Sequence, residues 1–316
     1  MELLLDANYL QLNLRLHKFS FVRRRVFRLL IPLVLAWGSL LWAAPEKPLV
    51  VSSFTVIQDW TQIIGDKHFE VFNLVPSRSE THGFQLGPRH VKELRRAALI
   101  IAMSPSLEPW LDDWIKANDR SSQVLWLHPE ADPKDSHDLE GDPHVWTSPK
   151  KAKFMVRRIA ERLTRLQPGI NLEVVTEQYF KEISALDGEL AALFKSLPTN
   201  KRSFISQHPN LGHFAQHFGL RVAGTILTNG SGEAADPSAR HFSELLAIVK
   251  KDDLRLVVTD TDQNDAIARR LTQDSQLPPP LPLAFEYLSP AGQPGDTWIT
   301  MMRSNGRKLH AALRDR

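Results

Sequence analysis

The sequence contains no cysteine among its 316 residues. Disulfide bonds are therefore excluded, and a hydrophobic core has to hold the fold together even in an oxidising compartment. An N-terminal cysteine carrying a lipid is excluded for the same reason. A long hydrophobic run is also missing, because the apolar stretch Leu29–Trp42 is shorter than the ~20 residues of a comfortable transmembrane helix.

That short apolar stretch has the flanks of an export signal. Four arginines between positions 23 and 28 precede it, and the small residues Ala43 and Ala44 follow it. Residues 1–44 are therefore predicted to be a secretory signal peptide, with an uncleaved membrane anchor as the alternative. The rest of the chain is then expected in the periplasm, soluble and without a lipid anchor.

An excess of basic charge disappears once this leader is set aside. Residues 1–44 hold six of the 39 Lys and Arg and two of the 36 Asp and Glu, which leaves 33 basic and 34 acidic residues. The high isoelectric point of the full sequence therefore gives no support to nucleic-acid binding.

Strand-like and helix-like segments alternate from Leu49 onward. Apolar runs such as LVVSSF and ALIIAM are separated by amphipathic segments, a pattern that predicts an α/β fold with mainly parallel sheets flanked by helices. A long helix predicted over 171–197 divides two such halves. The expected organisation is an N-terminal lobe over 45–168, an interlobe helix over 169–198 and a C-terminal lobe over 199–316. Two further helices are expected to begin at Ser148-Pro149, before the long helix, and at Asp236-Pro237, after it.

Several metal-ligating side chains follow the predicted strands. His208 directly follows RSFISQ, Glu286 directly follows LPLAF, and His82 follows FEVFNLV through a polar loop; His144 lies on the loop before a helix, and Asp260 ends LRLVVTD. In open α/β sheets, ligands bind beyond the carboxyl ends of the strands. Three imidazoles and a carboxylate suit a divalent transition metal, so we expect His82, His144 and His208 to form a metal site with one of the two carboxylates, Glu286 or Asp260.

Other histidines offer competing interpretations. His213 and His217 are spaced i, i+4 on one predicted helix and could clamp a metal, but the glutamate of a zinc-protease helix is absent. His128 and His137 lie in a polar loop that either binds metal weakly or serves as a linker. A single loop histidine is more often a hydrogen-bonding or capping residue than a ligand.

The order of several segments resembles a known family. DPHVW before SPKKAK, SLEPWLDDWI, ISQHPNLGHFAQHFGL, DPSARHFSELL and EYLSPAGQPGDTWITMMRSNGRKL together are similar to the periplasmic solute-binding proteins of zinc and manganese ABC transporters, in the cluster with a rigid interlobe helix. The resemblance covers about Leu49 to Leu313. It implies that His82, His144 and His208 match the first three metal ligands and that Glu286 takes the fourth position, usually an aspartate. Asp260 matches an acidic position with a structural or supporting role.

The resemblance implies a carrier rather than an enzyme. Such a carrier captures Zn²⁺, or alternatively Mn²⁺, between two lobes as a monomer and delivers it to an ABC permease in the inner membrane. Three departures stand out: the loop of His82 lacks the usual Asp-Pro, Glu286 replaces aspartate, and the histidine-rich loop of many zinc-specific members is missing. The alternatives are a zinc-dependent hydrolase, with Glu80 or Asp260 as the base, and a surface adhesin of the same architecture.

Overall fold

The computed structural model describes residues 47–128, 141–227, 237–261 and 263–315. The predicted signal peptide and His137 therefore lie outside the described residues. Residues Pro48–Arg316 form one compact unit. None of the helices within the described ranges is long and apolar enough to cross a membrane.

The first half of the chain forms a parallel four-stranded sheet with the order β2-β1-β3-β4. Its strands are β1 (Leu49–Phe54), β2 (Glu70–Val75), β3 (Leu99–Ala102) and β4 (Val124–Trp126). Every residue of β1 and β3 is buried, so neither strand alternates between buried and exposed positions. The sheet is thus covered on both faces.

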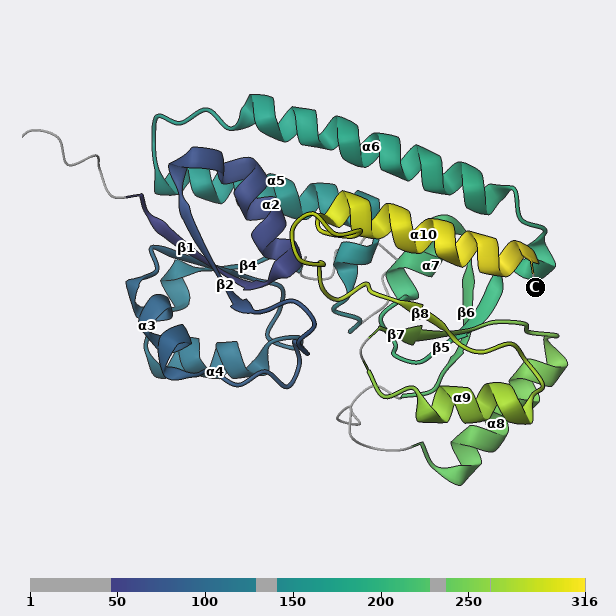
Figure 1. The fold of residues 1–316 in the computed structure, drawn as a ribbon. Coiled ribbons are helices and arrows are strands. Elements are labelled where there is room, and N and C mark those ends of the chain that lie inside the picture. Colours follow the sequence, from purple (N-terminus) through teal and green to yellow (C-terminus); the bar gives the residue numbers. More distant parts are fainter. Residues whose placement is uncertain (1–46, 129–140, 228–236, 262, 316) are drawn as a thin grey trace, which may run out of the picture. The chain divides into compact units, whose positions relative to one another are not determined.

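Two pairs of helices cover this sheet (Figure 1). α3 (Pro88–Arg96) and α4 (Pro109–Ala117) pack on one face through Leu94, Leu111 and Ile115. α2 (Thr55–Gly65) and α5 (Pro149–Leu166) pack on the other. The short 3-10 helices are η1 (Asp66–His68), η2 (Ser121–Gln123) and η3 (Val145–Thr147).

The second half repeats this arrangement with the strand order β6-β5-β7-β8, again parallel. The strands are β5 (Ser203–Ser206), β6 (Arg221–Thr225), β7 (Val257–Asp260) and β8 (Leu281–Leu283). α8 (Ala239–Lys251) and α9 (Ala266–Asp274) cover one face, and α7 (Gly212–Phe218) and α10 (Trp298–Asp315) cover the other (Figure 1). The predicted fold class, two mainly parallel sheets flanked by helices, is confirmed.

The predicted long helix is α6 (Glu173–Lys195), 23 residues in length. It is followed by the short η4 (Thr199–Lys201). Six of its residues are buried at spacings of three or four, which places one apolar stripe along the helix: Thr176, Tyr179, Ile183, Leu186, Leu190 and Phe194. This stripe contacts α5, α7 and α10. The domain boundaries at 168/169 and 198/199 stay predictions, and α6 lies between them.

Two helix starts differ in detail from the sequence-based expectation. Ser148 is the N-cap residue of α5, but its hydroxyl lies 3.2 Å from Nδ1 of His217 and makes no capping hydrogen bond. The expected Asp-Pro start of α8 is wrong, because Ser238 is the N-cap and its Oγ accepts the backbone N–H of His241. Asp236 itself lies outside the described residues, and a hydroxyl two residues later does the capping that was expected of it.

Candidate metal centre

Three histidines from separate loops converge at the carboxyl ends of the strands. His82 follows β2, His144 precedes η3, and His208 directly follows β5. Each offers one ring nitrogen, and the three atoms lie within 4.8 Å of one another. The Nε2 atoms of His82 and His144 are 3.4 Å apart. In a tetrahedral zinc site with Zn–N bonds of 2.0–2.1 Å, neighbouring ligand atoms lie about 3.3–3.4 Å apart. The histidines therefore have the spacing of a metal site.

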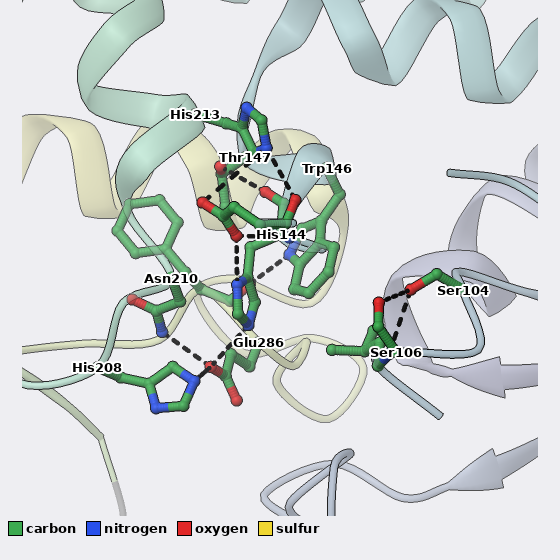
Figure 2. A network of polar contacts seen from close by, with 12 residues as sticks. Ser104, Ser106, His144, Trp146, Thr147, His208, Asn210, His213 and Glu286 are labelled. Atoms are coloured by element: carbon green, nitrogen blue, oxygen red, sulfur yellow. Dashed lines mark hydrogen bonds and ion pairs between the residues drawn. The ribbon is translucent and has the colours of Figure 1, made fainter. Parts of the chain in front are cut away.

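Glu286 lies beside this group, three residues after the end of β8. Its Oε1 atom is 3.6 Å from Nε2 of His208 and 3.9 Å from Nε2 of His144. Figure 2 shows the side chains of Glu286, His208 and His144 pointing toward one another. A carboxylate at this position could complete a four-ligand set of three nitrogens and one oxygen.

A hydrogen bond fixes the ring of His144. Its Nδ1 lies 2.7 Å from Oδ1 of Asp142, which also accepts the backbone N–H of His144 at 3.0 Å. An Nδ1–H that donates to a carboxylate leaves Nε2 as the acceptor that faces the site. The spacing of two residues between Asp142 and His144 is the sequence signal that could have indicated this bond.

Asn210 holds two acidic side chains in place. Its Nδ2 donates to Oε1 of Glu286 and to Oδ1 of Asp260, both at 2.8 Å. Figure 2 shows the amide beside Glu286. The sequence gives no signal for this role, because Asn210 reaches Glu286 across 76 positions of the chain. The same amide group therefore connects Asp260 to Glu286.

Trp146 links the loop of His144 to the loop of Glu286. Its Nε1–H donates to the backbone oxygen of Phe285 at 2.8 Å, and its own backbone oxygen accepts from Nε1 of Trp298 at 3.0 Å. The indole is 1% exposed and packs against Phe54. Trp146 therefore packs the loop of His144 onto the rest of the protein.

The surroundings favour neutral imidazoles and an ionised carboxylate. Burial lowers the pKa of His82 to about 4, with the nearby His144 acting in the same direction. Burial likewise lowers the pKa of His208. Burial alone would raise the pKa of Glu286, but the pKa is lowered because the carboxylate attracts His208 and His144 whenever these are protonated and accepts a hydrogen bond from Asn210. These are the protonation states that a metal requires of its ligands.

The other predicted candidates lie away from this cluster. His213 and His217 share α7 but have different partners: Nε2 of His213 lies 3.0 Å from the backbone oxygen of Asp142, and Nε2 of His217 lies 2.7 Å from Asp187. They therefore do not form a metal-binding pair. His128 lies 3.4 Å from the same oxygen of Asp142. His213 and His128 thus contact the loop of His144 through Asp142, whereas His217 contacts Asp187.

The comparisons with known proteins agree with this architecture. The family described as zinc-uptake complex component A, periplasmic (ZnuA) matches residues 50–312. The zinc-binding protein AdcA of Streptococcus pyogenes is 25% identical over 83% of this chain, and the chain covers 55% of that relative. The chain thus spans about half the length of the curated relatives it matches first.

Solved structures share the fold. The periplasmic zinc-binding protein TroA of Treponema pallidum has a TM-score of 0.75 at 23% identity, covering 85% of this chain and 99% of that one. A Mn-bound periplasmic metal-binding protein from Candidatus Liberibacter asiaticus has a TM-score of 0.73 at 21% identity, covering 84% and 100%. Because the family match spans most of the chain, this protein belongs to the ZnuA family of periplasmic zinc-uptake components.

Proposed function

We propose that this protein captures Zn²⁺ in the periplasm and delivers it to an ABC permease of the inner membrane. The observation that carries the proposal is the convergence of three imidazole nitrogens within 4.8 Å, with Glu286 beside them. Three nitrogen donors and one carboxylate favour zinc over manganese, which prefers more oxygen ligands. Mn²⁺ is the alternative cargo.

The ligand set proposed is His82, His144, His208 and Glu286. All four residues come from one chain, which supports a carrier that acts as a monomer. Asp142 and Asn210 orient two of them, as the partners behind metal ligands do in other sites. The permease as recipient rests on the family, whose description names a component of a zinc-uptake complex.

The alternative of a zinc-dependent hydrolase is not supported. The family to which the chain belongs is a transport component rather than a hydrolase family.

Metal binding by residues 45–316 tests this proposal. The protein is stripped with a chelator, and Zn²⁺ and Mn²⁺ are added separately while the melting temperature and calorimetric stoichiometry are followed. A ligand at about 1,000 times its Kd should add about 4 kcal/mol of stability. We expect one tight zinc site and a weaker response to manganese. No shift with zinc, or the same shift in His144→Ala as in a His68→Ala control, would contradict the proposal.

A further inference from the structure

A cavity of about 540 Å³ adjoins the candidate metal centre on the side of the second sheet. Its wall contains residues at the ends of β7 and β8, among them Asp260 and Glu286, and the start of α9. The loop after β2 closes the opposite side with Arg78, Ser79 and Glu80. Glu286 thus belongs both to the cavity wall and to the group of candidate ligands.

The charged side chains on this wall favour a cation. Three of them are carboxylates (Glu80, Asp260 and Glu286) and one is a guanidinium, Arg78. Burial, with help from the charge of Glu286, raises the pKa of Asp260 to about 7, so its charge is partial near neutral pH. Glu80 is exposed and keeps its place through a 2.9 Å hydrogen bond from the backbone N–H of Gly83.

The cavity is also large enough for a hydrated ion. Six water molecules at about 30 Å³ each occupy about 180 Å³. The volume therefore suffices for a divalent ion with its first hydration shell, and the cavity shares Glu286 with the candidate ligands.

We propose that this cavity is the vestibule through which the hydrated metal ion reaches and leaves the three histidines. Glu80 attracts the ion from the exposed rim, and Glu286 is the first ligand that it meets. This inference rests on the proposed function, because it specifies the route to the same site. It assigns Glu80, predicted from sequence as a possible catalytic base, to capture of the ion.

Stopped-flow kinetics with Zn²⁺ test the route through two kinds of variant. Glu80→Gln removes the charge and keeps an oxygen that can accept from Gly83. Glu70→Gln is its control, because Glu70 is also exposed but starts β2 at the opposite end of the strand. We expect Glu80→Gln to lower the association rate about two- to fivefold at low salt, to lose most of that difference at high salt, and to leave dissociation unchanged.

Ala266→Trp narrows the cavity from its exposed side, because Ala266 is the first residue of α9 and lines the cavity. Ala239→Trp is the matched control, since Ala239 is the exposed first residue of α8 and is not part of the wall. A narrowed route should slow association and dissociation by the same factor and leave Kd unchanged. Wild-type kinetics in either Glu80→Gln or Ala266→Trp would overturn the proposal. Failure of the proposed function would look different, because the wild-type protein would then bind no zinc.

Discussion

Asp142 accepts a hydrogen bond from Nδ1 of His144 at 2.7 Å while its backbone oxygen lies 3.0 Å from Nε2 of His213. The bond fixes which ring nitrogen of His144 faces the site, and the contact with His213 ties the loop to α7. His144 is 3% exposed, so water has little access to compete for this bond. The orientation of the candidate ligand His144 therefore depends on Asp142, which is not itself a candidate ligand.

The first prediction concerns that orientation. Asp142→Asn should weaken zinc binding by about tenfold or more, because partners of metal-bound histidines typically contribute 10- to 100-fold to affinity. Asp187→Asn is the control, since Asp187 accepts from His217, which lies outside the site. Competition against a chelator of known affinity measures both. Equal affinity in the two variants would show that the Asp142 bond has no part in binding.

The second prediction separates the two carboxyl groups held by Asn210. Glu286→Gln should lower zinc affinity by at least about tenfold, because it removes a charged ligand. Asp260→Asn should lower the affinity less, because Asp260 is connected to Glu286 through Asn210 and is not itself a proposed ligand. The same competition assay gives the ranking. A larger loss in Asp260→Asn than in Glu286→Gln would mean that the fourth ligand has been assigned to the wrong residue.

The third prediction concerns the close crossing of α6 and α10. A Cβ added at Gly306 would lie 2.6 Å from Cδ2 of Leu190, whereas nothing lies within 4 Å of one added at Gly188 in the exposed middle of α6. Gly306→Ala should cost about 1–3 kcal/mol of unfolding free energy through overpacking. Gly188→Ala should add about 0.5–1 kcal/mol, because glycine weakens a helix interior. Urea unfolding would reveal the opposite signs, and a shared sign would refute the close-packed crossing.

The fourth prediction concerns Glu108, which is 0% exposed and accepts the backbone N–H groups of Met103 and Ser104. Burial raises its pKa from 4.5 to about 7. Between these pH values the folded protein keeps a proton that the unfolded chain has released, so the unfolding free energy falls as the pH rises.

Glu108→Gln should remove this fall, which amounts to about 2–3 kcal/mol between pH 4.5 and 7. Denaturant unfolding at several pH values, with chelator present to remove metal linkage, measures the difference between the variant and the wild type. Glu70→Gln serves as the exposed control. If the wild type and Glu108→Gln change in parallel with pH, the carboxyl group is not protonated in the folded protein.

Much of the fold could be predicted because strand and helix leave different periodic patterns. The run ALIIAM is apolar throughout since β3 is buried on both faces, and such runs predicted parallel sheets correctly. The family resemblance, carried by DPHVW and the segments around it, is confirmed by the match over residues 50–312. The position of a residue at a strand end predicted which histidines to consider, and the structure brings His82, His144 and His208 together.

Contacts between distant segments could not be predicted in the same way. Asn210 connects Glu286 and Asp260, and the missing side chain of Gly306 leaves room for Leu190. Neither Asn210 nor Gly306 stands out in its own stretch of sequence. The start of α8 was misplaced because Asp-Pro and Ser are both good helix starts, and only the bond from His241 to Ser238 decides between them. The pattern of apolar residues within one segment indicates which of its side chains are buried, but it does not indicate which distant residues they contact.

X-ray absorption at the zinc edge, on zinc-loaded protein and on His144→Ala, tests the proposed ligand set most directly. The wild-type spectrum should fit three imidazoles and one carboxylate oxygen at about 2.0–2.2 Å. The imidazole count should fall to two in His144→Ala, with affinity lost in parallel. A wild-type shell without three imidazoles, or an unchanged imidazole count in the variant, would contradict the assignment of His82, His144, His208 and Glu286 as the zinc ligands.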